Sequence, residues 1–200
     1  MQNLAELLYS ATEDEYDLRN LAIQGDECCD LTAGAIDLYD CHLTDCTLNN
    51  CSFRGTGFTR VTFDHCDLTG TRFTDCGLKE LRFRDCRLMG TVFSGCLLND
   101  IAFHDCSCRY INLSGCTLRH CSFLRGNYLG GFFSGLNCSG TTVDSCDFTS
   151  CDFSGTNVRG FDFSRCNVEG ARWSRDKLKG ATFTAIQAID LARTLGIRIV

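Results

Sequence analysis

The sequence lacks any apolar run that approaches the roughly 18 residues of a membrane-spanning helix. It also lacks a basic stretch at the N-terminus, where the first charged residues are Glu6, Glu13, Asp14 and Glu15. A secretory signal begins with a basic stretch, so these features do not fit one. We therefore expect a cytoplasmic protein with no membrane partner.

The chain is also short of positive charge, with 19 Lys and Arg residues against 25 Asp and Glu residues and a net charge of -6. A site that binds phosphate mainly by attraction needs clustered Lys and Arg. We therefore expect no direct binding of nucleic acid. A length of 200 residues suits a single structural unit.

Proline is absent, whereas cysteine is abundant, with 17 residues. Such a number is typical of a disulfide scaffold or of metal sites, and position decides between these alternatives and plain packing. The positions follow from a repeat of five residues that runs from Asp17 to Thr184 without a change of register.

Two columns of apolar residues define this repeat. The central position of each five, which we call i, is usually Leu, Phe or Val, as in Leu38, Leu43, Leu48, Phe53, Phe58, Phe63, Leu68 and Phe73. Position i-2 holds a small or medium residue, as in Cys41, Cys46, Cys51, Thr56, Val61, Cys66 and Thr71. This spacing matches neither a helix nor a strand of sustained alternation, but it fits a chain that turns a corner every five residues.

Units such as Cys66-Asp67-Leu68-Thr69-Gly70 and Thr156-Asn157-Val158-Arg159-Gly160 resemble the motif of the pentapeptide-repeat family. The resemblance implies an all-β fold, a right-handed quadrilateral β-helix with four sides in each coil. Residues 17–184 would make between eight and nine coils, or a rod of roughly 40 Å at the usual strand spacing.

The cysteines lie mainly on the inward column. Thirteen occupy position i-2, and Cys46, Cys66, Cys86 and Cys106 recur every 20 residues, which predicts a ladder of buried thiols one coil apart. Parallel side chains about 4.8 Å apart are too far apart for the usual disulfide geometry, so we expect reduced packing residues. The four histidines fall at outward positions, away from nearly every cysteine, and we expect no metal site.

A rod filled by stacked Phe and Leu residues offers no large concave pocket for catalysis. The glycine-rich stretch from Gly126 to Gly131 lies inside the repeat register and is no phosphate-binding loop. We therefore expect no enzymatic activity and no cofactor. An inserted loop of five or ten residues remains an alternative between Gly126 and Gly140, where Leu129 and Phe132 fall on the outside.

Both ends of a solenoid need caps. Residues 1–16 carry Leu4, Leu7 and Leu8 at helical spacing and are predicted to cap the N-terminal end, before the solenoid of residues 17–184. Residues 185–200 are predicted to form a capping helix and a short strand, with Thr184 as the helix cap and Gly196 as its stop signal.

This tail also resembles the ends of pentapeptide-repeat proteins that protect topoisomerases. These are the plasmid quinolone-resistance, mycobacterial fluoroquinolone-resistance, microcin-immunity and albicidin-resistance proteins. The resemblance implies a homodimer joined through the C-terminal end. The residues implied at the dimer interface are Phe183, Ile186, Ile189, Leu191, Leu195, Ile197 and Ile199.

The same resemblance implies a rod that imitates duplex DNA, binds DNA gyrase or topoisomerase IV and relieves inhibition by a poison. Two adjacent sides of the predicted rod carry an excess of acidic residues, and the opposite two an excess of basic residues. The predicted docking surface is the acidic run Asp45, Asp64, Asp85, Asp105, Asp144 and Asp162. The alternative is a scaffold that binds some other protein, with charge scattered on a soluble rod.

Overall fold

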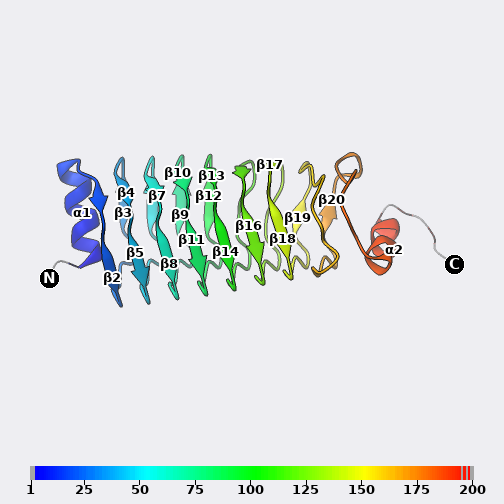
Figure 1. Cartoon of the computed structure of the whole chain (residues 1–200), viewed down its shortest axis with the longest axis horizontal. Helices are drawn as coiled ribbons and strands as arrows, with labels where there is room; N and C mark the ends of the chain where they lie inside the picture. The colour runs from blue at the N-terminus through cyan, green and yellow to red at the C-terminus, as the bar shows by residue number, and fades with distance from the viewer. Residues whose placement is uncertain (1–2, 195, 197, 199–200) are drawn as a thin grey trace.

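The chain forms a rod of stacked coils with a helix at each end (Figure 1). The structure is a computed structural model that describes residues 3–194, 196 and 198. Helix α1 (Leu4–Asp14) covers the N-terminal end, and helix α2 (Ala185–Thr194) lies at the C-terminal end. Within the described residues, no helix is both long and apolar enough to span a membrane.

Each coil takes 20 residues and has four sides, which we number 1 to 4 in chain order. The strands of side 1 are β1 (Leu18–Arg19), β4 (Asp37–Tyr39), β7 (Gly57–Thr59), β10 (Gly77–Lys79), β13 (Leu97–Asn99), β15 (Thr117–Arg119) and β17 (Asn137–Ser139). The strands of side 2 are β2 (Ala22–Gln24), β5 (His42–Thr44), β8 (Thr62–Asp64), β11 (Arg82–Arg84), β14 (Ala102–His104), β16 (Ser122–Leu124) and β18 (Thr142–Asp144). Both sheets are parallel throughout.

Side 3 is joined by isolated parallel bridges from Glu27↔Thr47 to Asp147↔Asn167. The strands of side 4 are β3 (Thr32–Gly34), β6 (Ser52–Arg54), β9 (Arg72–Thr74), β12 (Val92–Ser94), β19 (Asp152–Phe153) and β20 (Arg172–Trp173). A short 3-10 helix, η1 (Arg175–Lys177), interrupts the last coil. The β-solenoid with four sides in each coil, which the resemblance to the pentapeptide-repeat family implied, is confirmed.

The two inward columns form the core. On side 2, Phe63, Phe83, Phe103 and Phe123 stack with ring centroids 5.0 to 5.2 Å apart. The i-2 cysteines are buried beside them, as the register predicts. No loop interrupts the coils between Gly126 and Gly140, because hydrogen bonds between coils continue there, as from the Asn127 amide to the Cys106 carbonyl at 2.9 Å.

Glycine replaces the usual i-2 residue at two positions for a packing reason. A Cβ atom on Gly126 would lie 2.5 Å from Cε2 of Tyr128, and one on Gly131 would lie 2.8 Å from Cε2 of Phe133. The two rings therefore fill the space that a Cys or Thr side chain takes in other coils. The sequence left an inserted loop open as an alternative here, whereas the structure keeps the coils continuous, with the two rings in the space of the missing side chains.

Helix α1 closes the first coil as a cap. Asn3 and Glu6 form a capping box at its start, and the Leu4 amide donates to Asp26 Oδ2 at 2.7 Å. Leu4, Leu8 and Ala11 are buried against the solenoid. The helix thus covers apolar residues of the first coil that no further coil would cover.

Candidate protein-interaction surfaces

The predicted acidic run lies on side 2 and its corners, on the outside of the stacked phenylalanines. Asp64 and Asp144 end strands β8 and β18, and Asp162 continues side 2 beyond the last strand. Asp45, Asp85 and Asp105 lie at the corner that follows each strand, where φ is +53°, +51° and +57°. Asp tolerates this left-handed conformation better than most residues do, so the backbone gives these three positions a structural reason for Asp.

Cations and hydrogen-bond donors, most of them from neighbouring coils, contact most of this run. Arg125 binds Asp105 through two bonds of 2.7 Å, and its guanidinium lowers the pKa of the Asp105 carboxyl. Arg165 lies 3.3 Å from Asp144. In the same run, Asp45 accepts from Gln24 at 3.3 Å and Asp162 accepts from the Ser164 amide at 2.9 Å. Side 2 is therefore a surface of alternating charges.

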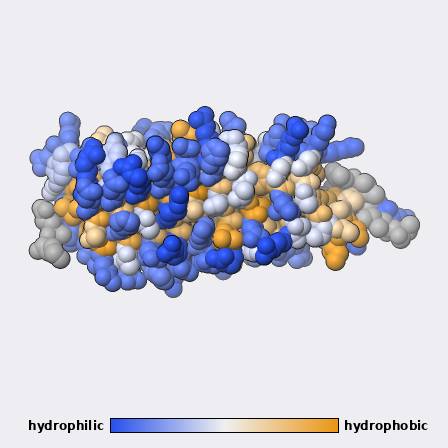
Figure 2. All heavy atoms as spheres, viewed as in Figure 1, coloured by the Kyte–Doolittle hydropathy of each residue, from blue (hydrophilic) through white to orange (hydrophobic). Residues whose placement is uncertain are grey.

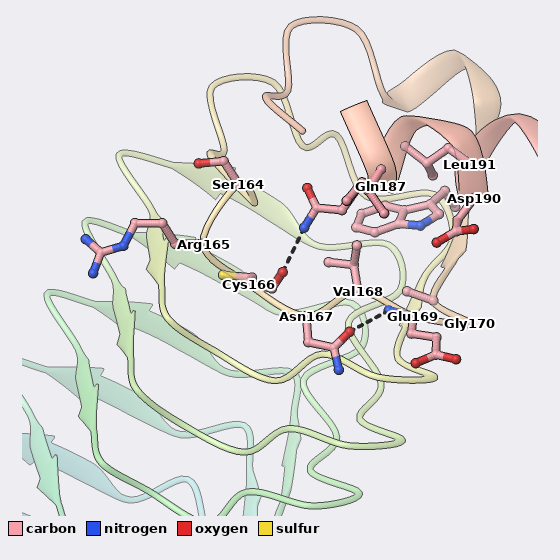
Figure 3. A pocket seen from close by; sticks show the side chains of 13 residues that line it. Ser164, Arg165, Cys166, Asn167, Val168, Glu169, Gly170, Gln187, Asp190 and Leu191 are labelled. Atoms are coloured by element: carbon pink, nitrogen blue, oxygen red, sulfur yellow. Dashed lines mark hydrogen bonds between the residues drawn. The ribbon is translucent and has the colours of Figure 1, made fainter. Parts of the chain in front are cut away.

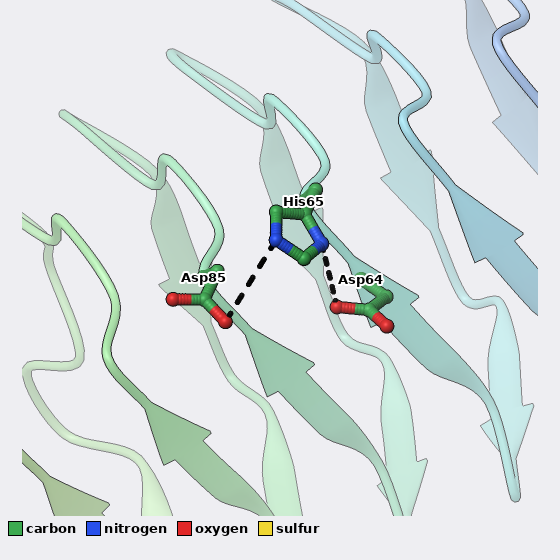
Figure 4. A group of neighbouring side chains, drawn as sticks. All are labelled: Asp64, His65 and Asp85. Atoms are coloured by element: carbon green, nitrogen blue, oxygen red, sulfur yellow. Dashed lines mark ion pairs between the residues drawn. The ribbon is translucent and has the colours of Figure 1, made fainter.

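The closest group in the run is Asp64, His65 and Asp85, in which the imidazole lies between the two carboxylates (Figure 4). His65 Nδ1 is 2.9 Å from Asp64 Oδ1, and its Nε2 is 4.0 Å from Asp85 Oδ2. Their ligand-type atoms all lie within 4.8 Å of one another. Arg84 also lies 3.9 Å from Asp64, and its positive charge opposes binding of a cation there. We interpret the group as an ion-pair network, and the absence of a metal site stays a prediction.

One arginine of side 2 pairs with a residue outside the acidic run. Arg82 and Arg84 share side 2 with the acidic run, where a positive charge reduces the repulsion between carboxylates. Arg84 lies 3.9 Å from Asp64 and so reduces the repulsion there, but Arg82 turns toward the corner between sides 1 and 2 in the next coil. It donates there to the Asp100 carbonyl at 2.7 Å and to the Asp100 carboxylate at 3.2 Å.

The charge of the rod is uneven both around it and along it. Between residues 17 and 184, sides 2 and 3 carry 12 acidic and six basic residues, whereas sides 1 and 4 carry eight acidic and 11 basic residues. Along the axis, residues 1–30 carry eight acidic residues and one basic residue, and residues 171–200 carry two acidic and six basic residues. Negative charge thus gathers at the α1 end and on sides 2 and 3.

The C-terminal end is a second candidate surface. Thr184 and Gln187 cap α2 reciprocally, and Gln187 Nε2 donates to the Phe163 and Cys166 carbonyls at 2.9 and 2.7 Å. Between α2 and the last coils lies an open hollow of about 500 Å³ (Figure 3). Its wall includes Trp173 and Asp190. Helix α2 is therefore fastened to the last coils but does not fill the space beside them.

The residues predicted at a dimer interface differ in how far they are exposed to solvent. Ile186 is 75% exposed and Ile189 is 38% exposed, while Phe183 is half-buried and stacks on Phe163 at 5.2 Å. Leu191 is half-buried in the wall of the hollow. The predictions for Leu195, Ile197 and Ile199 lie outside the described residues. The described part of this end therefore keeps apolar side chains in contact with solvent.

Hydrophilic side chains cover most of the face shown in Figure 2, and hydrophobic residues come to the surface near the α2 end. Sequence reasoning gave little weight to a further set of exposed apolar residues at mid-rod, including Met89, Tyr110 and Phe132. Their outward register was readable from the repeat, since all three fall at i-1, i+1 or i+2.

The cysteines offer no exposed cluster for chemistry among the described residues. All 17 are free thiols, of which only Cys29 is exposed and Cys138 half-buried. Buried thiols such as Cys66 and Cys86 lie 3.3 Å from backbone carbonyls of the preceding coil. Burial raises the pKa of Cys121 to about 11 and that of Cys151 to about 12, so both thiols keep their protons at neutral pH.

Comparison with solved structures finds several matches, among them proteins described as pentapeptide repeat proteins. A trypsin-treated form of QnrB1, a plasmid-mediated fluoroquinolone resistance protein, is 18% identical, covering 92% of this chain and 99% of that chain with a TM-score of 0.44. HetL, involved in heterocyst differentiation regulation in the cyanobacterium Nostoc, is 14% identical, covering 91% and 95% with a TM-score of 0.36. A protein of the Arabidopsis thaliana thylakoid lumen is 18% identical, covering 54% and 74% with a TM-score of 0.40. Scores this low carry no argument about function.

No curated protein matches the chain. Two family descriptions do match: the pentapeptide repeat region over residues 56–133, and the pentapeptide repeats, in eight copies, over residues 36–75 and 133–170. The matched segments join without a gap from residue 36 to residue 170. Together with the four-sided solenoid, these matches show that the chain belongs to the pentapeptide repeat family.

Proposed function

We propose that this chain is a cytoplasmic homodimer that binds a type II topoisomerase, DNA gyrase or topoisomerase IV, and protects it from an antibiotic or peptide toxin. The observation that carries the proposal is the charge asymmetry around the rod, with 12 acidic and six basic residues on sides 2 and 3. A protein that takes the place of DNA in a basic groove must present negative potential on its docking surface. The resemblance of the tail to topoisomerase-protecting proteins supports the same partner.

The ion pairs on side 2 are compatible with such docking. Their members are substantially exposed, as in Arg84–Asp64 with 62% and 28% of the side chains accessible. Exposed pairs of this kind contribute roughly 0 to 1 kcal/mol. A basic groove on the partner can therefore displace Arg84 from Asp64 at little cost, whereas Arg125 is held more firmly on Asp105 by two bonds of 2.7 Å. We expect the acidic run to add association rate and selectivity more than bulk affinity.

Dimer formation is proposed to occur through the C-terminal end. Ile186 and Ile189 project from α2 into solvent, and the hollow beside Trp173 is large enough to take side chains from a second copy. Burial of such residues contributes about 25 cal/mol for each Å² of apolar surface removed from water. Two rods joined in this way would carry acidic surfaces toward both outer ends, with the basic residues of the C-terminal ends between them.

The proposal is tested by a gyrase supercoiling assay with added protein, with and without a panel of gyrase poisons. We expect supercoiling to be restored in the presence of at least one poison, and the effect to weaken as salt is raised. Bovine serum albumin at equal mass controls for non-specific crowding. Absence of rescue across the panel, together with no effect on gyrase alone, would contradict the proposal.

The second candidate function is a scaffold that binds a different protein. The observation in its favour is the pairing of Asp64, Asp105 and Asp144 with arginines, which reduces the free negative charge of side 2. Direct binding separates the two candidates, because a scaffold for another protein shows no binding to immobilised gyrase at low salt.

A further inference from the structure

A small surface at the corner between sides 3 and 4 differs from the rest of the rod. Nine outward positions in three successive coils make it up, and we name it the corner patch: Met89, Gly90, Val92, Arg109, Tyr110, Asn112, Leu129, Gly130 and Phe132. Hydrogen bonds between coils hold these rows in register, with the Gly90 amide donating to the Arg109 carbonyl at 2.9 Å and the Tyr110 amide to the Leu129 carbonyl at 3.0 Å.

The corner patch exposes large apolar side chains. Met89 is 45% exposed, Tyr110 48% and Phe132 42%, while Val92 and Leu129 are half-buried around them. Exposed apolar residues scattered singly need no explanation, but a contiguous group marks an interaction site. The patch is contiguous because its members occupy neighbouring columns of adjoining coils.

The fold does not require these residues. Elsewhere the same three columns carry polar side chains or glycine: Asn49, Thr69 and Thr149 in the first, Asn50, Gly70 and Ser150 in the second, and Ser52, Arg72 and Asp152 in the third. Those coils keep the same backbone and the same bonds between coils. The apolar character of the patch therefore has no structural cause in the repeat.

The central ring of the patch has a defined position. A Cβ atom on Gly130 would lie 2.6 Å from Cε1 of Tyr110, so the ring covers the glycine of the next coil. The Arg109 guanidinium lies 5.8 Å from the centroid of the same ring. Tyr, Arg, Phe and Met are the residue types enriched at the centres of protein interfaces, and a ring resting on backbone loses little freedom on binding.

Charge indicates the kind of partner. The patch contains no carboxylate, and Arg72 and Arg87 occupy outward positions next to it, in addition to Arg109 within it. No ion pair of Arg72 or Arg109 occurs among the described residues, and Arg87 is 3.9 Å from Asp67. Asp152 borders Phe132 in the next coil, but it pairs with Arg172 at 3.4 Å. Arg72, Arg87 and Arg109 therefore leave this surface with a net positive charge. An apolar surface of that charge complements a segment that combines apolar and acidic side chains.

We propose that the corner patch binds a short segment of another protein that carries apolar side chains and carboxylates. Three coils span about 14 Å, which equals some nine residues of helix or four of extended chain. The corner patch lies on side 4 and on the edge of side 3 that is farthest from side 2, away from the acidic run. We expect its partner to be acidic, whereas the topoisomerase groove proposed for side 2 is basic. The rod thus has two docking surfaces of different chemistry, so it joins two partners.

The test begins with random twelve-residue peptides displayed on phage and selected against the full-length protein. We expect the selected peptides to be enriched in Asp or Glu together with Leu, Ile, Phe or Trp, and to bind more weakly as salt rises. Dissociation constants of fluorescein-labelled peptides are then measured by anisotropy for the parent and for variants.

Each new residue in these variants is one that another coil carries at the equivalent position of the repeat. Tyr110→Asn/Phe132→Ser places in the patch what Asn50 and Ser52 hold in another coil, and should raise the dissociation constant by at least about tenfold. Arg109→Thr should raise it by about threefold and reduce its dependence on salt. The control Leu97→Thr removes an equally exposed apolar side chain from side 1, where Thr117 follows in the same column, and should leave binding unchanged.

Several results would overturn the proposal. Selected peptides rich in Lys or Arg would contradict the charge argument, and peptides whose binding survives Tyr110→Asn/Phe132→Ser bind elsewhere. Competition by a twelve-residue oligothymidylate would make the patch a nucleic-acid site instead. Concentration-dependent association of the parent that the double variant abolishes would make the occupant a second copy of this chain. Thermal unfolding is measured for each variant to confirm that it is folded. If the double variant is unfolded, Arg109→Thr still tests whether the labelled peptides bind at the corner patch.

Discussion

Replacement of Phe103 by alanine tests the packing of the rod at its middle. The Phe103 side chain has 0% exposure, and its ring stacks on Phe83 at 5.0 Å and on Phe123 at 5.2 Å. It also meets Phe93 edge-on, with centroids 6.5 Å apart. Phe103→Ala therefore removes a ring that has aromatic neighbours on three sides.

The expected cost lies near the top of the range for such a change. Substitution of a buried Phe by Ala costs about 3 to 5 kcal/mol through lost transfer free energy and the cavity that remains. The coils above and below cannot close this cavity, since the Ala102 amide is bonded to the Leu81 carbonyl at 2.9 Å and the Ser122 amide to the Ile101 carbonyl at 2.8 Å. Lost aromatic contacts add to the cost, so we expect about 4 to 5 kcal/mol.

The assay is urea denaturation followed by far-ultraviolet circular dichroism. Val143→Ala is the matched control in the same column, because Val143 is 8% exposed and borders a small internal cavity near Cys138, so it should lose less stability than Phe103→Ala. Ser122→Ala, on the surface of the same side, should change stability by less than about 0.5 kcal/mol. A loss for Phe103→Ala no larger than that for Ser122→Ala would refute the five-residue register of the core.

Three further predictions concern the thiols and the C-terminal end. A thiol reagent at neutral pH should modify Cys29 quickly in the native protein and all 17 cysteines after unfolding; rapid reaction of several native thiols would contradict the burial of the ladders. Folding raises the pKa of Cys121 to about 11 and that of Cys151 to about 12, so the free energy of unfolding should keep its full value below pH 9 and fall as the pH rises further. The expected loss is about 1.4 kcal/mol for each such thiol and each pH unit. A urea midpoint at pH 10 equal to that at neutral pH would count against this. Deletion of residues 186–200 should give monomers or aggregates by light scattering, and an unchanged dimer mass would exclude α2 from the interface.

The core could be read from the sequence because the period fixes which side chains point inward. Every fifth residue from Leu38 onward and the residue two places before it are the ones that the structure buries, apart from a few near the ends, the half-buried Cys138 and the additionally buried Ala102. The helix cap at Thr184 was also predictable, since a hydroxyl residue three places before Gln187 is a common start signal.

The contacts of surface side chains were harder to predict, because each outward side chain has several neighbours within reach. A spacing of 20 residues links Arg125 to Asp105, and this pair was accessible from the register alone. Arg82 instead reaches Asp100 at the preceding corner, which depends on side-chain direction and not on sequence spacing. For a similar reason, the sequence did not show that the Tyr128 ring occupies the space next to Gly126. A ring that folds back over its own side of the coil leaves no sign in the sequence other than the glycine.

The central claim is that carboxylates on side 2 engage the topoisomerase. It is tested most directly by measuring the affinity of immobilised gyrase for the parent protein and for Asp64→Asn/Asp85→Asn/Asp105→Asn, at low and moderate salt. Asn suits the corner conformation of Asp85 and Asp105, so folding should be retained.

The matched control carries Asn in place of Asp37, Asp75 and Asp152, which lie on sides 1 and 4 away from the corner shared with side 2. We expect the side 2 variant to bind gyrase more weakly and with less dependence on salt, and the control to bind like the parent. Equal affinity of the side 2 variant and the parent at both salt concentrations would contradict the account.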